Sequence, residues 1–587
     1  MNNREIAAVF ERVADLLEFQ NANPFRVRAY RGGARRVGDS PESLAAIVAD
    51  RGAEALTELD GVGKDLAGKI AELVETGRLE MLEELLAEVP AGVLDVMRVP
   101  GLGPKKAAAL HKELGVATLE ELRAACESNR VRDLKGFGAK TEEKILAGLA
   151  IAASAQERTR WANAEPTVLA VLEHLGTLDE VLRIDPAGSY RRGRETVGDL
   201  DFLVDIGEEL DAALVEKVMD RFGAFESVDS VVARGETKMT VRMASGLQAD
   251  LRVVPTESYG AALQYFTGSK DHNVEVRGRA KQRGLRINEW GVFKTDDDGE
   301  QGERVAGDSE EDVYAALDLP RFPPELREAR REFELAEAGP LPELVTLDDL
   351  RGDLHMHTTA TDGKATLEEM ATAARERGLE YIAITDHSKR VSMAGGLDAE
   401  RLRKQWAMID ELRATLPKGF SVLKGIECDI LEKGGMDLPD DVLAEADWVV
   451  ASLHYGQQQP RAQIMKRLVG ALENPWVSIV AHPTGRLINK RESYDVAVDE
   501  LIAAAAENGK LLELNANPAR LDLDDVHCAA AKTKGVPIVI SSDAHSVEGL
   551  AVLRHGVQQA RRAGLTASDV ANTRTWKQLG KLVRRGE

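Results

Sequence analysis

The spacing of hydrophobic residues changes twice along the chain. Over the first 150 residues, apolar positions recur every three to four residues, beginning with MNNREIAAVFERVADLLEF, which is typical of amphipathic helices. From about residue 165, strand-like runs such as DLDFLVDI, TKMTVRM and LQADLRVVP alternate with helical stretches. From residue 350 onward, short apolar strands alternate regularly with helices. The pattern predicts an all-α region, then an α+β region, then an α/β barrel.

The length of the chain and its proline-rich stretch suggest several domains. At about 150 residues per domain, 587 residues predict roughly four. Five prolines between residues 320 and 342 predict a linker that carries one short helix, 325–337. The expected segments are a helical domain (1–85), a second helical domain (86–160), an α+β domain (161–260), a smaller domain (261–318), the linker (319–349) and the barrel (350–587).

Composition narrows the class of protein. The hydrophobic share of 43% and the charged share of 30% are ordinary for globular domains, and no apolar run approaches the ~20 residues of a membrane span. The N-terminus lacks the apolar core of a secretory signal, and three scattered cysteines exclude a disulfide framework. We therefore expect a cytoplasmic protein with no membrane partner.

The net charge of the chain and the local clusters of charge give different indications about a nucleic-acid partner. Acids outnumber bases by 99 to 76, giving −23, which taken alone argues against a nucleic-acid partner. The basic residues, however, are clustered at 25–36, 102–112 and 277–286. Local segments, rather than the total, would therefore meet a phosphate backbone.

Histidines gather at the strand ends of the last region. Six of the 11 histidines lie there, together with three acids, whereas a single histidine is usually buried and satisfied or simply exposed. In barrels the C-terminal ends of the strands form the catalytic face. Nitrogen and oxygen ligands without sulfur suit two or three Mn²⁺ or Zn²⁺ ions. The predicted ligands are His355, His357, Asp362, His387, Glu427, His454, His482, Asp543 and His545, with Asp386 as an outer neighbour.

A second acidic motif predicts another metal site. In GDLDFLV, Asp199 and Asp201 lie on one face of a strand, and Asp250 in QADLRVV lies on a second strand. Three carboxylates so placed can hold two Mg²⁺ or Mn²⁺ ions for phosphoryl transfer, although an acidic loop is the commoner reading of such a motif alone. Upstream, Gly188 and Ser189 begin a predicted helix whose N–H groups can meet a phosphate, with arginines beside it.

The continuation of these motifs resembles known families. GSYRRGRETVGDLDFLV, GETKM, ADLRVVP and YGAALQYFTGSKDHNVEVRGRAKQRGLRINEWGVF are similar to the palm and thumb of DNA polymerase family X. The histidine motifs resemble the PHP (polymerase and histidinol phosphatase) family, whose barrel cleaves phosphoesters at a trinuclear metal site. The resemblance covers nearly the whole chain and implies a palm at 161–260, a thumb at 261–318 and a PHP barrel at 350–587, as in bacterial family X polymerases.

The resemblance also implies residue roles. Asp199, Asp201 and Asp250 match metal-binding carboxylates, with Asp250 also accepting the proton of the primer hydroxyl. The positions matching a nucleotide site are Gly188, Ser189 and Arg192 at the triphosphate, Tyr265, Phe266 and Gly268 at the sugar, and Asn273 and Arg277 at the minor groove of the base pair. Lys270 and Gln248 depart from the better-known animal enzyme, which has an acid and an arginine there, and Lys270 is a further candidate nucleotide contact.

Three glycine-rich repeats, 59–70, 99–110 and 134–145, fit helix-hairpin-helix elements that bind a DNA phosphate without reading bases. One such turn is usually only a turn, but two with the same flanks favour DNA contacts; the third carries Glu142 and Glu143 and fits a structural role. The candidate contacts in the first two are Gly61, Gly63, Lys64, Gly101, Gly103 and Lys105.

The segment FRVRAYRGGARR (25–36) holds five arginines and no acid. It is either a solvated helix face or a pocket for the 5′-phosphate at a DNA gap, with Arg26, Tyr30 and Arg35 as candidates. Lys69 matches the family's Schiff-base lysine for removing 5′-deoxyribose phosphate and is a candidate lyase residue.

The function expected from all of this is a template-directed DNA polymerase that fills short gaps in DNA repair, including base excision and end repair. The barrel would act as a Mn²⁺-dependent 3′–5′ exonuclease, with cleavage at abasic sites as a further candidate activity. The expected partners are gapped or primer-template DNA, 5′-phosphate ends and dNTPs, for a monomeric enzyme. The alternatives are a PHP phosphatase with a vestigial palm, a non-catalytic gap-binding scaffold, and a template-independent transferase.

Overall fold

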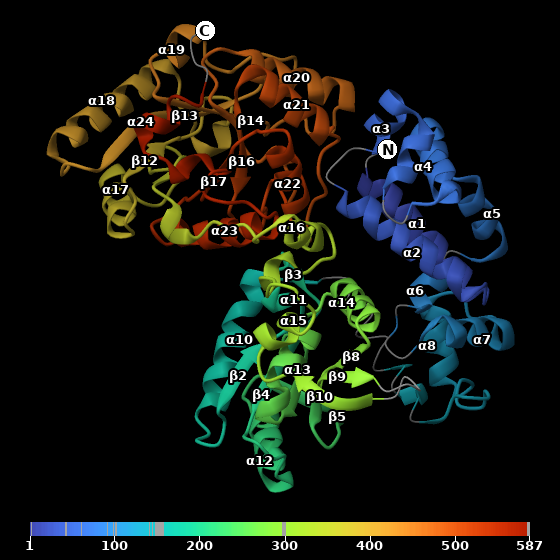
Figure 1. Cartoon of the computed structure of the whole chain (residues 1–587). Helices are drawn as coiled ribbons and strands as arrows, with labels where there is room; N and C mark the ends of the chain where they lie inside the picture. Colours follow the sequence, from blue (N-terminus) through green and yellow to red (C-terminus); the bar gives the residue numbers. More distant parts are fainter. Residues whose placement is uncertain are drawn as a thin grey trace. The chain divides into compact units, whose positions relative to one another are not determined.

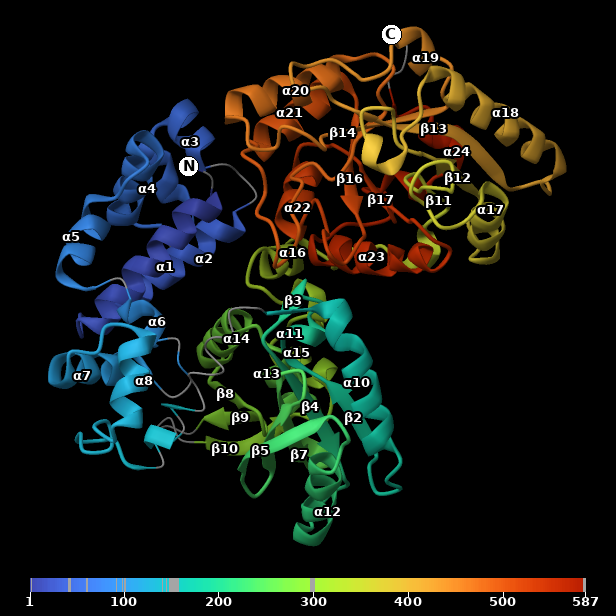
Figure 2. The ribbon, with the colours of Figure 1, turned by 180° about the vertical axis from the view of Figure 1, so that it is seen from behind.

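The computed structural model divides into two compact units, 1–158 and 159–587, which we describe separately (Figures 1 and 2). None of the helices in the described parts of the chain is long and apolar enough to cross a bilayer. The structure describes residues 1, 3–40, 44–59, 62–90, 92–97, 99, 102–139, 141–143, 145–146, 158–295 and 301–583.

The first unit is helical, as the amphipathic pattern predicts. Its helices bury one continuous apolar core, in which α1 and α2 pack along each other. Helices α4 and α7 both start directly after a glycine of the repeats and end at a left-handed glycine, Gly77 and Gly115. The elements are α1 (Asn3–Phe19), α2 (Pro24–Asp39), α3 (Leu44–Arg51), η1 (Ala53–Glu58), α4 (Lys64–Thr76), α5 (Glu80–Glu88), α6 (Val93–Met97), α7 (Pro104–Leu114) and α8 (Leu119–Glu127).

The second unit begins with a five-stranded sheet in the order β2-β4-β7-β6-β5, in which only β4 and β7 are parallel neighbours. Apolar residues of α10 and α12 share one core with the sheet. The elements are β1 (Thr159–Arg160), α10 (Trp161–Gly176), β2 (Arg183–Pro186), α11 (Gly188–Arg191), β3 (Thr196–Val197), β4 (Asp199–Asp205), α12 (Ala212–Gly223), β5 (Val228–Arg234), β6 (Lys238–Met243) and β7 (Gln248–Val254).

A smaller helical and β region follows, with its own core. The segment expected to be a linker is packed into that core: Phe322 and Phe333 are buried, and the fully buried Arg327 pairs with Glu310 at 2.5 Å. The expected helix 325–337 is present as two shorter helices. The elements are η2 (Thr256–Ser258), α13 (Tyr259–Thr267), α14 (Lys270–Gln282), β8 (Leu285–Asn288), β9 (Gly291–Thr295), β10 (Gln301–Ala306), α15 (Glu310–Ala315), η3 (Pro324–Leu326), α16 (Glu332–Ala338) and η4 (Leu347–Asp349).

The last region is a sheet of seven parallel strands in sequence order, which confirms the predicted α/β barrel. A bridge between Met356 and Ala544, just after the first and last strands, brings the two edges together. The strands are β11 (Gly352–Asp353), β12 (Tyr381–Ile384), β13 (Ser421–Asp429), β14 (Trp448–Ser452), β15 (Ile479–Val480), β16 (Leu511–Asn515) and β17 (Ile538–Ser541).

Side chains of the barrel strands alternate between two apolar cores. In β12, Ile382 and Ile384 pack in the larger core, whereas Tyr381 and Ala383 belong to a smaller core to which every strand or its end contributes. The helices of this region are α17 (Leu367–Glu376), η5 (Ser392–Ala394), α18 (Ala399–Thr415), α19 (Asp440–Leu443), α20 (Arg461–Glu473), α21 (Val498–Asn508), α22 (Asp525–Thr533), η6 (Glu548–Val552), α23 (Leu553–Arg562), η7 (Ala571–Thr573) and α24 (Trp576–Leu579).

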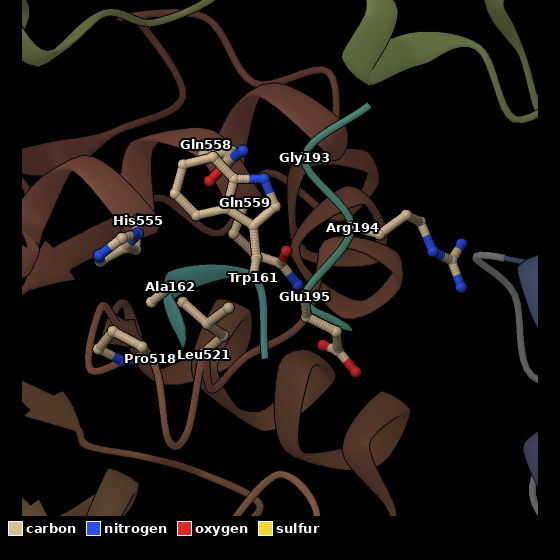
Figure 3. A pocket seen from close by; sticks show the side chains of 10 residues that line it. All are labelled: Trp161, Ala162, Gly193, Arg194, Glu195, Pro518, Leu521, His555, Gln558 and Gln559. Carbon is tan, nitrogen blue, oxygen red and sulfur yellow. The ribbon is translucent and has the colours of Figure 1, made fainter. Parts of the chain in front are cut away.

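The five-stranded region docks directly on the barrel within this unit. Figure 3 shows a pocket to which both contribute, with Trp161 and Glu195 from the first and His555 and Gln558 from α23 of the second. The rings of Trp161 and His555 meet edge to face at 5.6 Å, and Glu195 pairs with the buried Arg486 at 2.6 Å. Side-chain contacts, in addition to the chain connection, therefore fix the barrel against the sheet.

Candidate metal centres and nucleotide site

The strand register brings the three predicted aspartates together. Asp201 on β4 lies directly beside Asp250 on β7, and Asp199 lies two residues earlier on β4. Removal from water, together with repulsion from Asp199 and Asp250, raises the pKa of Asp201 to about 7. Lys238 Nζ lies 2.6 Å from Asp250 Oδ2 and partly compensates the charge. Three carboxylates gathered on two neighbouring strands are a suitable donor set for divalent cations.

The turn before β4 leaves space for only a glycine beside these carboxylates. Gly188 has a φ of +61°, and a Cβ there would lie 2.2 Å from Asp201 Oδ2. The predicted helix start is confirmed, since α11 begins at Gly188. Ser189 Oγ is buried without a hydrogen-bond partner among the described residues. This hydroxyl is therefore available for a ligand at the aspartates.

The two arginines of the GSYRRG motif have different surroundings. Arg191 forms a bidentate pair with Glu310 at 2.8 and 2.9 Å and is held within the protein. Arg192 donates from Nη1 to the carbonyl oxygen of Thr267 at 2.6 Å and from Nε to Glu328 at 3.1 Å. Of the two, Arg192 lies beside Gly268, whose added Cβ would approach its Nη1 at 3.4 Å. The structure thus places Arg192 next to the predicted sugar-binding turn.

The turn after α13 is supported by an amide network. Asn273 is buried, donates to the carbonyl oxygen of Tyr265 at 2.7 Å and accepts from Gln264 at 2.8 Å. Both ends of its amide hold the turn, and its role at the minor groove of the base pair stays a prediction. The Arg252 guanidinium lies 4.0 Å from the ring centre of Phe266. Arg277 and Lys270 are exposed on α14 and remain accessible to a ligand.

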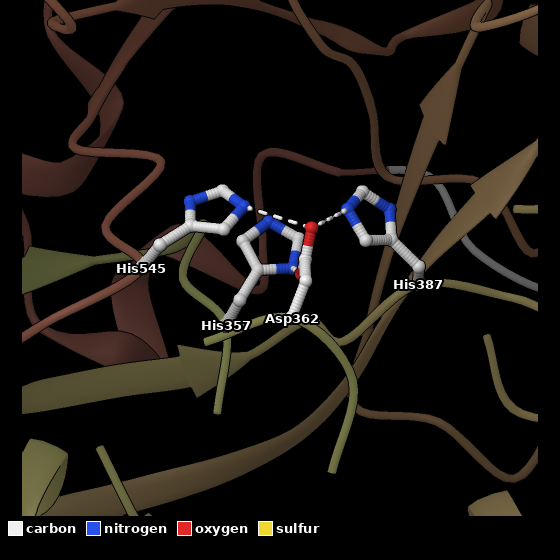
Figure 4. A group of neighbouring side chains, drawn as sticks. All are labelled: His357, Asp362, His387 and His545. Atoms are coloured by element: carbon white, nitrogen blue, oxygen red, sulfur yellow. Dashed lines mark ion pairs between the residues drawn. The ribbon is translucent and has the colours of Figure 1, made fainter. Parts of the chain in front are cut away.

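The barrel gathers all nine predicted metal ligands at one end of its strands. Three groups have candidate ligand atoms within 4.8 Å of one another, and His357 and His387 each belong to two of them. Figure 4 shows the group formed by His357, Asp362, His387 and His545, with the Asp362 carboxylate between His387 and His545. His482, outside these groups, contacts Glu427 at 3.1 Å. The groups are His357, Asp362, His387 and His545; His355, His357 and Asp543; and His387, Glu427 and His454.

The chemistry of this cluster fits divalent metal ions. His355 Nε2, both ring nitrogens of His357 and Glu427 Oε2 are buried without hydrogen-bond partners among the described residues. Burial alone would raise the pKa of Glu427, but the surrounding histidines outweigh it, and that pKa lies well below its usual range. An ionised carboxylate among unsatisfied imidazole nitrogens is a donor set of the Mn²⁺ or Zn²⁺ type.

Two carboxylates that the sequence analysis missed orient the ligands. Glu513 on β16 contacts His355 Nδ1 at 2.7 Å, and Asp429 on β13 contacts His454 Nδ1 at 3.0 Å. Asp386 lies outside the three groups, as predicted, and accepts from the Thr358 amide at 2.9 Å. For Glu513 the available signal was a carboxylate in the middle of the mostly apolar strand LLELN, whereas Asp429 is the last residue of a strand that already contains charged residues. Such partners fix the tautomer and orientation of metal-binding histidines.

Replacing Glu513 by Gln is expected to weaken Mn²⁺ binding about 10- to 100-fold, because His355 would lose the acceptor that orients its ring. The measurement is a Mn²⁺ titration that follows thermal unfolding of the full chain. Glu507→Gln, an exposed position on α21, is the matched control. Equal Mn²⁺ affinity of Glu513→Gln and the unmodified chain would contradict the orienting role.

The glycine repeats are described in part, because Gly61 and Gly101 lie outside the described residues. Gly63 and Gly103 directly precede α4 and α7, and a Cβ added at either would meet open space among the described residues beyond its own chain neighbours. Lys64 and Lys105 are exposed in the first turns of these helices. The repeats therefore present accessible helix starts with a basic residue, as expected for phosphate contacts.

The arginine-rich helix α2 corrects one prediction. Arg26 and Arg35 are exposed, but Tyr30 is only 1% exposed and belongs to the core. Its hydroxyl lies 3.1 Å from Met81 Sδ and 3.4 Å from Asp65. The residue is an aromatic core residue rather than a surface contact for DNA, because its ring is enclosed by α1 and its own hydroxyl is engaged.

Lys69, the candidate lyase residue, lies beside Tyr30 and Asp65. Its Nζ lies 2.5 Å from Asp65 Oδ1 and 6.0 Å from the ring centre of Tyr30. Burial alone would lower the pKa of Lys69, but the hydrogen bond to Asp65 and the neighbouring Tyr30 outweigh it, and the net pKa is raised. The protonated form, which is not a nucleophile, is therefore favoured.

Comparison with known protein families assigns a family to part of each main region of the chain. A DNA polymerase beta palm matches residues 162–239 and a DNA polymerase beta thumb matches 262–328. A PHP domain matches 353–517. A helix-hairpin-helix domain matches 1–79, and a SAM-like helix-hairpin-helix tandem matches 93–150. The predicted fold classes are thereby confirmed.

Individual relatives agree with these families. The chain is 41% identical to the DNA polymerase/3′-5′ exonuclease PolX of Bacillus subtilis (strain 168), over 100% of both chains. The barrel region is 30% identical to a probable phosphatase of Thermoanaerobacter sp. (strain X514), over 38% of this chain and 89% of that protein. A probable phosphatase of Acetivibrio thermocellus is 32% identical over 33% of this chain and 78% of its own length. Because the first relative is matched from end to end, the chain belongs to the bacterial family X DNA polymerases that carry a C-terminal PHP domain.

Proposed function

We propose that the protein extends DNA primers on a template at its five-stranded domain and removes 3′-terminal nucleotides at its barrel. The observation that carries the proposal is the presence of two separate donor sets in one unit. The first is Asp199, Asp201 and Asp250 on β4 and β7, and the second is the eight grouped ligands of the barrel together with His482, which contacts Glu427. Both sets bind divalent metal, which we propose to be Mg²⁺ or Mn²⁺ at the aspartates and two to three Mn²⁺ or Zn²⁺ ions in the barrel.

At the palm, the three aspartates would hold the metal ions, and Asp250 would accept the proton of the primer 3′-hydroxyl. Bound Mg²⁺ would lower the pKa of that hydroxyl and neutralise the leaving pyrophosphate. Ser189 and Arg192 would bind the triphosphate, and the turn at Tyr265, Phe266 and Gly268 would pack against the sugar. Lys270 and Arg277, exposed on α14, would reach the incoming nucleotide and the paired bases.

In the barrel, bound Mn²⁺ or Zn²⁺ would supply a hydroxide at neutral pH and a clamp for phosphate oxygens. Glu513 and Asp429 would hold their histidines in the tautomer that leaves Nε2 free for the metal. Attack on the last phosphodiester releases a nucleotide from the 3′ end, and the same attack at an abasic site would cut the strand there.

We propose a role in gap repair for the first unit. The exposed lysines Lys64 and Lys105 at helix starts would contact DNA phosphates, and Arg26 and Arg35 would bind the 5′-phosphate across a gap. We retain the domain limits expected from the sequence, with residues 319–349 reassigned from a free linker to a packed segment.

A second candidate function rests on the comparisons of the barrel alone. Its relatives named as probable phosphatases support release of phosphate from a small phosphomonoester, with the palm playing no catalytic part. The complete aspartate set argues against an inactive palm. Release of phosphate from histidinol phosphate without any shortening of DNA would favour this candidate.

The test is primer extension at a one-nucleotide gap with each dNTP supplied separately. Template-directed synthesis predicts incorporation of the complementary nucleotide only, and no addition to a single-stranded primer. Incorporation of all four nucleotides without a template would instead identify a template-independent transferase. Tight gap binding without turnover in Mg²⁺ or Mn²⁺ would identify a scaffold.

Lyase activity at Lys69 is expected to be weak, because its ion pair with Asp65 keeps the amine protonated. Borohydride should trap little of the unmodified chain on DNA carrying a 5′-deoxyribose phosphate. Asp65→Asn should increase trapping, and the added Lys69→Ala should remove the increase. Full cross-linking of a Lys69→Ala protein would exclude Lys69 as the Schiff-base residue.

A further inference from the structure

A row of buried charges joins the candidate triphosphate residue to the PHP barrel. Arg192 follows α11 in the palm, Glu328 lies between the thumb and the barrel, and Arg562 is the last residue of α23. Glu328 Oε1 lies 3.1 Å from Arg192 Nε and 3.0 Å from Arg562 Nη1. The three side chains are only 13%, 9% and 2% exposed, in the order Arg192, Glu328 and Arg562. Within this row, one carboxylate is shared by an arginine of the palm and an arginine of the barrel.

The row continues into the barrel and anchors there. Arg562 Nη2 lies 2.8 Å from Asp525 at the start of α22, and Arg330 contacts the same carboxylate at 3.0 Å. Glu328 and Arg330, two residues apart in one segment, are therefore both held by barrel side chains. Removing one partner of such a buried pair leaves an uncompensated charge, so these contacts are strongly coupled.

The surroundings of Arg192 fix the direction of its guanidinium. Glu328 holds Nε, and the carbonyl oxygen of Thr267 holds Nη1 at 2.6 Å. Arg562 also donates to the main-chain oxygen of Arg192 at 2.7 Å. An unrestrained arginine would lose rotamer freedom on binding a phosphate, whereas one already held at Nε and Nη1 has lost most of that freedom beforehand.

We propose that Glu328 and Arg562 are positioning residues for the incoming nucleotide. The barrel, through Arg562, holds Glu328, and Glu328 holds the guanidinium of Arg192 ready for the triphosphate. The inference rests on the proposed triphosphate role of Arg192. It assigns to the PHP barrel a contribution to nucleotide affinity that is separate from its metal cluster, because α23 contributes no member of that cluster.

The test measures KM and kcat for the complementary dNTP at a one-nucleotide gap, using the full chain. Glu328→Gln is expected to raise KM about tenfold or more, since Arg192 loses a charge-assisted hydrogen bond. Arg562→Gln is expected to raise KM about threefold to tenfold. For both, kcat changes less than KM, and removal of 3′-terminal nucleotides stays unchanged. The rise in KM of the double variant should be smaller than the product of the two single increases, because Arg562 acts mainly through Glu328 and only in addition through its hydrogen bond to the main-chain oxygen of Arg192.

The matched control is Arg554→Gln on the same helix. Arg554 also joins the barrel to the palm, but its ion-pair partner is Glu165, whereas Arg562 pairs with Glu328. An unchanged KM for Arg554→Gln would show that a weaker contact between the barrel and the palm does not by itself raise the KM for the dNTP. Thermal unfolding reports whether each variant folds. Arg562→Lys, which keeps the charge, is the second variant and is expected to have a KM between those of the unmodified chain and Arg562→Gln.

Arg192→Gln separates failure of this inference from failure of the nucleotide site. If Arg192→Gln raises KM but Glu328→Gln and Arg562→Gln do not, the positioning role is overturned while the triphosphate role stands. If Arg192→Gln leaves KM unchanged, the triphosphate role itself fails. A lower KM for Glu328→Gln would show that Glu328 competes with the nucleotide for Arg192, which also overturns the inference.

Discussion

Replacing Asp201 by Asn is expected to reduce primer extension at least ~1,000-fold while leaving removal of 3′-terminal nucleotides intact. Asp201 lies two residues from Asp199 along β4 and directly opposite Asp250 on β7, so its loss removes the central carboxylate of the set that would hold the metal ions. The amide that replaces this carboxylate would be neutral at every pH. Steady-state extension of a gapped primer in Mg²⁺ and in Mn²⁺ measures the effect.

The matched control for this variant is Asp229→Asn, an exposed aspartate on the edge strand β5 of the same sheet. It should extend primers at the rate of the unmodified chain. Because Asp201 and Asp250 are direct neighbours in the strand register, we expect Asp250→Asn to reduce primer extension as much as Asp201→Asn does. Extension that survives Asp199→Ala combined with Asp201→Ala would refute the palm site.

Replacing His357 by Ala is expected to abolish removal of 3′-terminal nucleotides, by at least ~1,000-fold, without slowing extension. His357 is buried, belongs to two of the three ligand groups and has no hydrogen-bond partner for either ring nitrogen within the described chain. Its loss therefore removes a ligand from two candidate metal positions at once. The readout is shortening of a 5′-labelled primer in Mn²⁺ without dNTPs.

His527→Gln provides the control, because His527 is a barrel histidine on α22 outside the three groups. It should shorten primers normally. A His357→Ala protein that still binds Mn²⁺ with unchanged affinity and degrades primers would show that the histidine cluster is not the nuclease site. The remaining ligands could still bind some metal in the single variant, so the combined variant His355→Ala and His357→Ala is tested as well.

Much of both sites follows from regular patterns in the sequence. Alternation along β4 predicts that Asp199 and Asp201 share a face, and parallel strands bring their C-terminal ends to one edge, which gathers the nine barrel ligands. The pairing of Asp201 with Asp250 needs the strand register, which the sequence alone does not fix. Fold class was therefore more predictable than contact geometry.

The missed residues have physical explanations. Glu513 orients a histidine from the middle of the mostly apolar strand β16, and Asp429 does so from the last position of β13, where neither carboxylate belongs to a recognisable motif. Tyr30 was predicted from the basic residues around it, but Val27, Tyr30 and Val37 are all buried, at the spacing of one helix face. The helical period was the better guide there, because a charge cluster and a buried aromatic can share one helix.

Contacts between domains could not be predicted from the sequence. Glu328 and Arg562 are 234 residues apart, and nothing in their local sequence indicates that they meet. The proline-rich segment also packs against the thumb core, although its composition is typical of a linker. Domain docking depends on the shape and charge of whole surfaces, and those exist only after each domain has folded.

The most direct test of the account uses one substrate and two conditions. The full chain is incubated with Mn²⁺ and a 5′-labelled primer bordering a one-nucleotide gap, with dNTPs in one reaction and without them in the other. If the chain carries both activities, the primer should be lengthened by one nucleotide in the first reaction and progressively shortened in the second. An unchanged primer in either reaction, at an enzyme concentration that saturates the gap, would contradict a chain that carries both activities.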